Sequence, residues 1–487
     1  MEPLFLVVDV GSSGVKAFLV DAAGGIVTRA ESPWERDRWL ADSGWCSIIQ
    51  AVRDAIGDRK LIQDSLRAVS VTSMREEFVL LDGSGSEVKA ELNEESYRFG
   101  ERIVEEHGEL MYDLSGHWPV PNWIAGAVLP WMRAECSGFR EARRFLMMAD
   151  WVVYKLSGVA CTEGSNACET SMYDVYRNDW AWELIDDLLL PRGIFPPVKR
   201  SGEALGTVTR EASKDTGIPT DALVVTGGAD TQCGLMGMGA QPGEAGAVGG
   251  TTTPVLTVTS NPVIDPRRRL WSNIHVEAGL WTLESNAGFT GRNMRWLRDL
   301  MGTGSYEYLN HEAGLVPPGS DGLLTFLGAH VFDSGPPYWK QDRLGDRNVP
   351  PTVMGKHDFS SGELARSIME SSCYAVKANL EQLEEASGAR FSSLKFCGGN
   401  SKSALWTQMQ SDVLGVPVVT PVISEGTAVG AAALAAVGSG VYSDIREAVE
   451  AMVRLKKPVA PDPGRSETYS RLYRDWMATR ERLHGTL

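Results

Sequence analysis

The stretch that decides the fold is Val224-Val225-Thr226-Gly227-Gly228-Ala229-Asp230-Thr231-Gln232, in which apolar residues lead into a glycine pair and then into a carboxylate. The apolar, β-branched residues predict a buried strand, and the glycine pair predicts a turn at its end. Asp230 would be presented at that strand end, and it is our candidate for a catalytic base. Strand-turn-Asp sequences occur in many α/β proteins, so this stretch needs support from other parts of the chain.

Comparable glycine turns flank this stretch at large distances along the chain. Leu6-Val7-Val8-Asp9-Val10-Gly11-Ser12-Ser13-Gly14 precedes it, and Leu394-Lys395-Phe396-Cys397-Gly398-Gly399-Asn400-Ser401 follows it. A further turn, Gly249-Gly250-Thr251-Thr252-Thr253, adds hydroxyl groups to the backbone donors. Glycine turns that follow strands expose rows of backbone N–H groups, and such rows bind phosphate oxygens. Each turn alone is more often an ordinary turn than a ligand site, but their combination favours a nucleotide site.

The composition limits the classes of protein and partner. The chain has 487 residues, which is longer than one hydrophobic core supports, so two or more domains are expected. It is 43% hydrophobic and 23% charged, as in globular proteins. The formal net charge of −16 argues against nucleic acid or an anionic membrane surface as a partner. We therefore expect small-molecule partners, with any anionic nucleotide held by a local site.

Cysteine and histidine spacing bears on compartment and on metal binding. The seven cysteines are scattered and form no Cys-x-x-Cys pair, which indicates reduced thiols in a cytoplasmic protein. The apolar run Leu4–Val8 has no cationic lead, so we expect neither a signal peptide nor a membrane span. The histidines lack zinc-ligand spacing, so any metal is expected to be Mg²⁺. The nucleotide signatures of P-loop and Rossmann folds are also missing from the sequence.

The order of strand and turn signals is similar in the two halves of the chain. In the first half, Leu4–Val8, a glycine turn and Ala17–Val20 predict a hairpin. In the second half, Gly246–Gly250, a polar turn and Val255–Val258 repeat that order. We therefore expect two related α/β domains, residues 1–242 and residues 243–487.

Three other places allow both a functional and a structural interpretation. Arg75-Glu76 follows a strand signal and could bind a polyhydroxylated molecule, although Arg-Glu pairs are more often solvated surface pairs. Asp150 lies in the apolar run Phe145–Val153, so it either has a functional role or serves as a helix cap or buried hydrogen-bonding group. The Ala- and Gly-rich run Ala428–Ala436 predicts either the close approach of a ligand or a tightly packed core helix.

Taken together, these residues resemble the FGGY carbohydrate kinases, and the resemblance covers essentially the whole chain. The family's first phosphate loop resembles Asp9–Lys16, its catalytic strand end Gly227–Gln232, its second phosphate loop Gly249–Thr253, and its adenosine loop Gly398–Lys402. The resemblance implies an α/β fold with two ribonuclease H-like domains flanking an ATP cleft, as in the superfamily of actin, hexokinase and the heat-shock chaperone ATPases. It also implies ATP and Mg²⁺ as cofactors, a small-molecule acceptor, and a possible homodimer.

Roles for individual residues follow from the resemblance. Asp230 would be the catalytic base, and Asp9 and Asp230 would hold the metal. The acceptor would be bound by Arg75, Glu76, Asp230 and Gln232. ATP would be bound by Gly11, Ser12, Ser13, Lys16, Gly250, Thr251, Thr252, Gly398, Gly399, Asn400 and Ser401.

Within the family, stretches such as Phe289-Thr290-Gly291 and Met294-Arg295-Trp296 resemble the branch that phosphorylates 4,5-dihydroxy-2,3-pentanedione, or autoinducer-2, on its terminal hydroxyl. Asn93–Arg98 departs from the family's Asp-x-Arg, so the acceptor-facing wall is expected to differ. Asn400 replaces a third glycine, which would tighten or redirect the adenosine loop.

Three alternative functions remain open. They are a kinase for a pentulose, polyol or sugar acid, a non-catalytic sugar-responsive regulator, and a chaperone ATPase, although no separate peptide-binding domain is evident.

Overall fold

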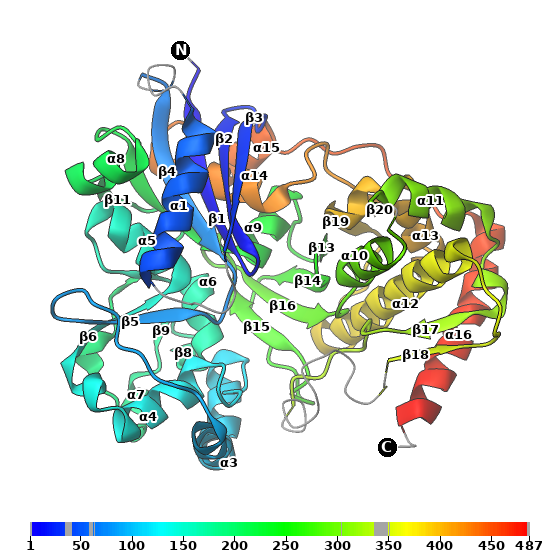
Figure 1. Cartoon of the computed structure of the whole chain (residues 1–487), viewed down its shortest axis with the longest axis horizontal. Coiled ribbons are helices and arrows are strands. Elements are labelled where there is room, and N and C mark those ends of the chain that lie inside the picture. Colours follow the sequence, from blue (N-terminus) through cyan, green and yellow to red (C-terminus); the bar gives the residue numbers. More distant parts are fainter. Residues whose placement is uncertain are drawn as a thin grey trace.

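The computed structural model describes residues 2–34, 41–57, 62, 64–302, 304–335, 349 and 351–484. Two six-stranded mixed sheets form the centres of two lobes (Figure 1). The first sheet has the order β11-β12-β4-β1-β2-β3 and the second has the order β15-β16-β14-β13-β19-β20. The strands of the first sheet are β1 (Leu4–Gly11), β2 (Gly14–Asp21), β3 (Ile26–Pro33), β4 (Leu66–Ser73), β11 (Ala204–Thr207) and β12 (Leu223–Ala229). Those of the second are β13 (Ala245–Gly249), β14 (Pro254–Thr259), β15 (Trp271–Ile274), β16 (Trp281–Asn286), β19 (Leu394–Gly398) and β20 (Val418–Val419).

The two sheets repeat one topology. β1 pairs antiparallel with β2 and parallel with β4. In the second sheet, β13 likewise pairs antiparallel with β14 and parallel with β19. This repetition confirms the predicted α/β fold with two related halves, while the boundary between residues 242 and 243 stays a prediction.

The first five residues of β1, Leu4–Val8, are all apolar because helices cover both faces of its sheet. Leu6, Val8 and Val10 pack into a core with helix α1 (Ala41–Ile56) and helix α5 (Met148–Ser157). Phe5 and Val7 alternate with them and pack on the opposite face against helix α14 (Gly426–Gly438). A strand buried on both faces has no polar alternation, as observed here.

The glycine pair Gly227-Gly228 is required because two neighbours approach the end of β12 closely, one from β4 and one from Val276. The register of the two strands shifts between Val225 and Gly228. A Cβ at Gly227 would lie 1.8 Å from the Val71 carbonyl oxygen, and one at Gly228 would lie 2.3 Å from Val276 Cγ1. No residue with a side chain fits either position, so the bulge that ends β12 depends on both glycines.

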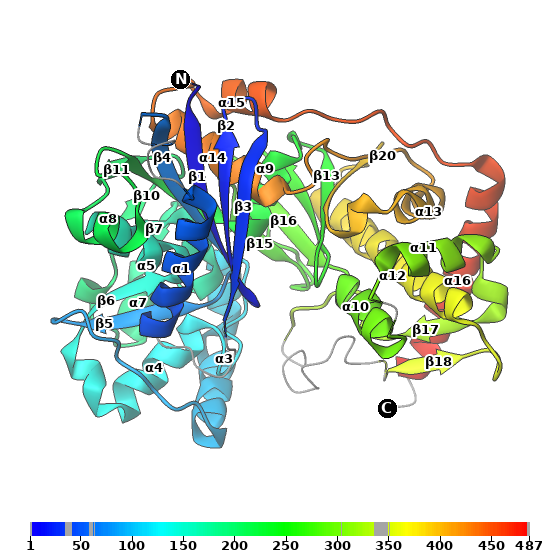
Figure 2. The ribbon, with the colours of Figure 1, turned by 45° about the horizontal axis from the view of Figure 1, so that its top comes forward.

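Helices from the second half of the sequence complete the first lobe. α14 and α15 (Ile445–Met452) lie against the first sheet, and both appear in orange beside the blue strands in Figures 1 and 2. α14 crosses α9 (Asp230–Gly237) so closely that a Cβ at Gly430 would lie 2.0 Å from the Cys233 carbonyl oxygen. The Ala- and Gly-rich run is therefore a tightly packed core helix.

The second lobe is built around the buried helix α12 (Ser361–Ser387), which packs on the sheet with Tyr469 and Trp476 of α16 (Pro463–His484). Helix α13 (Ala404–Leu414) follows the predicted adenosine loop, and it ends at Gly415 in the left-handed conformation. The other larger helices of the chain are α3 (Glu94–Ser115), α4 (Ala125–Glu135), α7 (Trp182–Asp187), α8 (Arg210–Thr216), α10 (Gly291–Leu300) and α11 (Tyr306–Leu315). Smaller strands pair as β5 (Phe78–Asp82) with β6 (Ala142–Met147), β7 (Thr162–Glu163) with β10 (Val198–Lys199), β8 (Tyr173–Asp174) with β9 (Asp179–Trp180), and β17 (Leu324–Phe326) with β18 (Thr352–Met354).

Asp150 has the structural role that its burial suggested. It lies in the first turn of α5, and its carboxylate accepts hydrogen bonds from the Thr162 hydroxyl at 2.6 Å and the Glu163 backbone N–H at 3.2 Å. Burial raises the pKa of Asp150 well above its usual value. In the part of the chain that the structure describes, no helix is long and apolar enough to cross a membrane.

The close crossing of α9 and α14 can be tested by comparing alanine substitutions at two helical glycines, Gly430 in α14 and Gly314 in α11. Gly430→Ala would force the two helices apart and lower the unfolding free energy by about 1–3 kcal/mol. Gly314→Ala in α11 meets no atom within 4 Å, so it is expected to be neutral or to stabilise the helix by up to about 1 kcal/mol. Urea unfolding of the two variants measures the difference, and equal midpoints would contradict the close packing.

Candidate active site

Three loops of the second lobe meet through contacts that only glycine permits. A Cβ at Gly398 would lie 2.4 Å from the Gly249 carbonyl oxygen, and one at Gly291 would lie 2.2 Å from the Gly250 carbonyl oxygen. The Asn400 amide donates to Thr290 Oγ1 at 3.1 Å, so the residue that replaces the expected third glycine ties two of these loops together. The predicted second phosphate loop and adenosine loop are thus held side by side.

The first predicted phosphate loop is the hairpin between β1 and β2. Gly11 pairs with Gly14 across the strands, and Ser12 and Ser13 form the exposed turn between them. A Cβ at Gly14 would lie 2.6 Å from the Ser32 carbonyl oxygen, and its φ of 155° is also unfavourable for other residues. The loop can therefore offer backbone N–H groups without interference from side chains at its base.

Asp9 lies in β1, opposite Lys16 in the strand register. Burial raises the pKa of Asp9 to about 6, and Lys16 opposes this shift while Asp230 and Glu425 add to it. Asp9 and Asp230 are therefore close enough to repel one another, although 221 positions separate them in the numbering. Two neighbouring carboxylates of this kind suit a divalent cation, which would relieve their repulsion.

Asp230 is the first residue of α9, directly after β12. The turn that presents it is held by Ser165, whose Oγ accepts a hydrogen bond from the Ala229 backbone N–H at 2.9 Å and donates one to Glu163 at 2.5 Å. From the second half of the chain, Thr427 donates to the Asp230 carbonyl oxygen at 3.1 Å. The Asp230 side chain remains 36% exposed, so it is accessible to a substrate.

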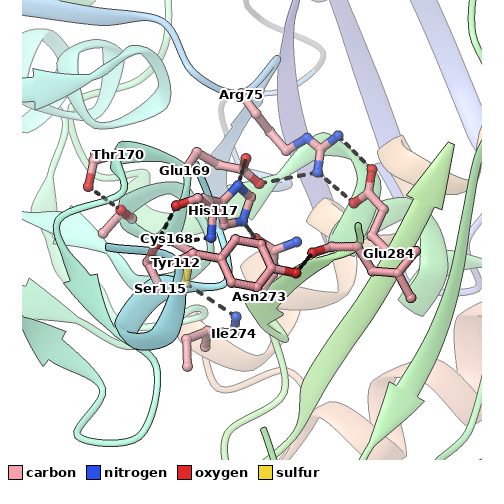
Figure 3. A network of polar contacts seen from close by, with 12 residues as sticks. Arg75, Tyr112, Ser115, His117, Cys168, Glu169, Thr170, Asn273, Ile274 and Glu284 are labelled. Atoms are coloured by element: carbon pink, nitrogen blue, oxygen red, sulfur yellow. Dashed lines mark hydrogen bonds and ion pairs between the residues drawn. The ribbon is translucent and has the colours of Figure 1, made fainter. Parts of the chain in front are cut away.

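Beside Asp230 lies a buried group of polar side chains that we call the Arg75 cluster, namely Arg75, His117, Glu169, Asn273 and Glu284 (Figure 3). Arg75 Nη1 and Nη2 form a bidentate pair with Glu284 at 2.6 and 2.8 Å, and Nη1 also lies 3.1 Å from Glu169. Arg75 Nε lies 4.0 Å from Asp230 Oδ1. The guanidinium therefore connects the first sheet, the second sheet and the catalytic candidate.

The rest of the cluster supports this arrangement. His117 Nε2 lies 2.7 Å from Asn273 Oδ1, and its ring stacks on Trp271, with centroids 5.1 Å apart. Trp271 in turn lies under the Arg75 guanidinium, 5.4 Å from its carbon. Burial lowers the pKa of His117 to about 3, so the imidazole is neutral at physiological pH.

The acidic members of the site are costly to ionise. Burial raises the pKa of Glu169 well above its usual value and also raises that of Glu284, while Arg75 opposes both shifts. Burial raises the pKa of Glu76 to about 7. Glu76 also has a φ of 70°, which is uncommon for a residue with a side chain and indicates local strain beside Asp230.

Two of the places that the sequence analysis singled out, Gln232 and residues 93–98, do not join the cluster around Arg75. Gln232 is fully buried, and neither of its amide atoms has a hydrogen-bond partner among the described residues. The departure at residues 93–98 forms the start of α3, where Asn93 caps the helix and Glu94 and Glu95 are exposed. Sequence reasoning missed Glu169 and Glu284, although two glutamates within buried stretches were a usable signal.

The donor set agrees with the expected metal. In the described ranges, no group of three or more His, Cys, Asp and Glu side chains is arranged to hold an ion. Mg²⁺ is usually bound through one or two carboxylates together with water and phosphate oxygens. Asp9 and Asp230 therefore fit a Mg²⁺ ion that arrives with a nucleotide.

Comparison with known proteins assigns the family of this two-lobed α/β protein. The model of the FGGY family of carbohydrate kinases matches in its N-terminal domain over residues 4–237 and in its C-terminal domain over residues 245–439. The chain belongs to this family and is a carbohydrate kinase. Enzymes of this kind use ATP, typically with Mg²⁺.

The chain is similar to two named enzymes over nearly its whole length. It is 31% identical to autoinducer-2 kinase of Enterobacter sp. (strain 638) and 30% identical to autoinducer-2 kinase of Escherichia coli (strain K12). Each alignment covers 97% of this chain and 93% of the relative.

Solved structures support the fold. Xylulose kinase from Lactobacillus acidophilus matches with a TM-score of 0.83 at 19% identity, and glycerol kinase from Plasmodium falciparum matches with 0.81 at 16% identity. Both matches cover 99% of this chain and 98% of the other chain. At this level of identity, the two structures establish the fold and leave the acceptor open.

The raised pKa of Asp9 predicts a conflict between stability and function. Its folded-state pKa lies above the unfolded value, so ionised Asp9 destabilises the fold at pH 8 and protonated Asp9 does not at pH 4. Without nucleotide and metal, Asp9→Asn should be more stable than the wild type by about 1–3 kcal/mol at pH 8. This gain should shrink as the pH falls from 6 to 4. Denaturation across this pH range measures it, and a variant less stable at pH 8 would contradict the electrostatic cause.

Removal of Arg75 should have a large effect on stability. Arg75→Met would leave Glu169 and Glu284 buried without a cation, which costs about 3–5 kcal/mol. The loss should be larger at pH 8 than at pH 5, because protons can neutralise the carboxylates at low pH. Arg29→Met is the control, since the Arg29 side chain is 40% exposed and its ion pairs contribute at most about 1 kcal/mol. Equal unfolding midpoints for the two variants would contradict this account.

Proposed function

We propose that this kinase transfers the γ-phosphoryl group of ATP to a primary hydroxyl of a small polyhydroxylated carbonyl compound, and that this acceptor is 4,5-dihydroxy-2,3-pentanedione. The observation that carries the reaction is the position of Asp230, an accessible carboxylate that lies 4.0 Å from Arg75 and whose charge acts on the buried Asp9. The similarity to autoinducer-2 kinases at 30–31% identity over 97% of the chain supports the choice of acceptor.

Asp230 is the residue suited to act as the base. Its side chain is 36% exposed, whereas those of Glu169 and Glu284 are fully buried and paired with Arg75. In the proposed step, Asp230 accepts the hydroxyl proton as the acceptor oxygen bonds to the γ-phosphorus, and the bond to the β-phosphate oxygen breaks to release ADP. Such transfer depends mainly on positioning and charge neutralisation.

The nucleotide would lie along the three glycine loops. Gly11, Ser12, Ser13 and Lys16 of the first hairpin, with Gly250, Thr251 and Thr252, would contact the β- and γ-phosphates. The residues that would approach the α-phosphate and adenosine are Gly398, Gly399, Asn400 and Ser401. Mg²⁺ held by Asp9 and Asp230 would neutralise phosphate charge.

Acceptor binding would use the polar groups beside Asp230. Arg75 Nε faces Asp230 at 4.0 Å, so an oxygen bound there would lie next to the base. Glu76, with a pKa of about 7, can donate or accept a hydrogen bond near neutral pH. Because the loops come from both lobes, closure of the lobes around ATP and acceptor would align the reactants and exclude water.

A kinase for a pentulose, a polyol or a sugar acid is the second candidate. The named structural neighbours include xylulose, gluconate and glycerol kinases, so the fold itself is compatible with each of these acceptors. A non-catalytic regulator is disfavoured, because Asp9 and Asp230 are both present and lie close to one another.

ADP release with Mg-ATP across a panel of acceptors tests the proposal. The panel contains 4,5-dihydroxy-2,3-pentanedione, pentuloses, glycerol, erythritol and gluconate, and the diketone should give the highest kcat/KM. Asp230→Asn should lower kcat by about 10²–10⁴-fold because the hydroxyl proton loses its acceptor. Asp186→Asn, which changes an exposed carboxylate paired with Arg192, is the control and should keep wild-type turnover. If only a pentulose is turned over, the acceptor is a pentulose and not the diketone. Near-normal turnover by Asp230→Asn would show that Asp230 is not the base.

A further inference from the structure

Thr290 stands at the start of helix α10, but its side chain does not cap that helix. A threonine in this position usually accepts a hydrogen bond from a backbone N–H of the first turn, which stabilises the helix. Here the Thr290 hydroxyl instead accepts a hydrogen bond from Asn400 Nδ2 at 3.1 Å and lies 2.6 Å from the Thr253 hydroxyl. Thr253 and Thr290 are both buried, so water competes little for these bonds.

The start of α10 also holds the backbone of the second predicted phosphate loop. The Arg292 N–H donates to the Thr251 carbonyl oxygen at 3.2 Å, and a Cβ at Gly291 would lie 2.2 Å from the Gly250 carbonyl oxygen. In a trans peptide, the carbonyl oxygen and the N–H that follows it point in opposite directions. Because the Thr251 carbonyl is turned toward α10, the Thr252 N–H is turned away from that helix, where it can donate to a phosphate oxygen.

The Asn400 side chain faces the same helix start with both ends of its amide. Its Nδ2 donates to Thr290, and its Oδ1 lies 3.0 Å from the place that a Cβ at Gly291 would take. Asn400 belongs to the predicted adenosine loop, whereas Thr253 belongs to the predicted second phosphate loop. The Thr290 hydroxyl is therefore a point at which side chains of the two loops meet.

We propose that Thr290 is a positioning residue for the nucleotide, and that its hydroxyl sets the spacing of the adenosine loop and the second phosphate loop through Asn400 and Thr253. This inference rests on the proposed kinase function and deepens it. It assigns the Asn400 side chain to the contact between the loops, and leaves the backbone of its loop to approach the nucleotide. Loops held at the right spacing bind more tightly, because they need no ordering when the ligand arrives.

ADP and AMP distinguish the spacing of the loops from the integrity of either loop. ADP would reach from the adenosine loop to the second phosphate loop, whereas AMP would contact the adenosine loop alone. Thr290→Val keeps the shape of the side chain and removes its hydroxyl. It should weaken ADP binding by about tenfold, as expected from the loss of two hydrogen bonds, and leave AMP binding within about threefold of the wild type.

Calorimetry with Mg²⁺ gives the Kd of ADP, and competition against ADP gives the Kd of AMP. Unfolded protein lowers the number of binding sites per chain and leaves the Kd of the remaining sites unchanged, so a loss of folded protein cannot imitate the expected result. Thr290→Ser restores the hydroxyl and should bind ADP within about threefold of the wild type.

Thr216→Val in α8 is the matched control. Thr216 is also fully buried, and its hydroxyl also forms two hydrogen bonds, donating to the Ala212 carbonyl oxygen at 2.6 Å and accepting from the Ile218 N–H at 3.2 Å. The same chemical change there should lower stability in a similar way, but it should keep the wild-type affinity for both nucleotides.

A double variant tests whether Thr290 acts through Asn400. Asn400→Ala and Thr290→Val remove the same hydrogen bond, so their effects should not multiply. The double variant should bind ADP no more than about threefold more weakly than Thr290→Val alone. Effects that multiply would overturn the assignment of the Asn400 side chain to this contact.

The outcomes separate this inference from the proposed function. Wild-type ADP binding by Thr290→Val, equal losses of ADP and AMP affinity, or a loss that Thr290→Ser does not restore would each overturn the inference. A wild type that binds no ADP would overturn it together with the nucleotide site. The expected changes in ADP binding without turnover of any panel acceptor would instead count against the proposed reaction and leave the positioning role standing.

Discussion

The arrangement of the two lobes depends on one buried ion pair. Arg75 lies just beyond the end of β4 in the first sheet, and Glu284 lies on β16 in the second, so their bidentate contact joins the two halves of the chain beside Asp230. A buried pair of this kind adds little net stability, because desolvation of both charges offsets their attraction. Its contribution is to anchor the two sheets to one another beside Asp230, since separation of Arg75 from Glu284 would leave buried charges unpaired.

Close backbone contacts hold the predicted phosphate and adenosine loops of the second lobe next to one another. Gly291 and Gly398 allow carbonyl oxygens to approach within distances that any side chain would block. The helices α9 and α14 meet in the same way through Gly237 and Gly430, which brings a helix from the second half of the sequence onto the first sheet. These contacts hold the loops and the two helices together through close backbone approach.

The site is assembled at the expense of stability. Asp9, Glu76, Glu169 and Glu284 all have raised pKa values because the fold buries more carboxylates than it neutralises. The positive φ of Glu76 adds backbone strain at the same place. Such concentrations of unfavourable charge and strain are typical of functional sites, where substrates and metal ions relieve them. In a carbohydrate kinase, the nucleotide and its metal would relieve the repulsion around Asp9.

The sequence by itself determined the local elements, namely the strands, the glycine turns and the carboxylate at the end of β12, because these depend on residues close together in the chain. It also determined the repeated order of strands, and hence the fold class and, through the resemblance, the family. Which residues bind ATP and the acceptor stays a prediction. Only the tertiary structure decided that Glu169 and Glu284 pair with Arg75, that His117 is neutral and that Asp150 has a structural role. The physical reason is that Glu169 and Glu284 stand 94 and 209 positions from Arg75, so only the packing of the folded chain brings them together.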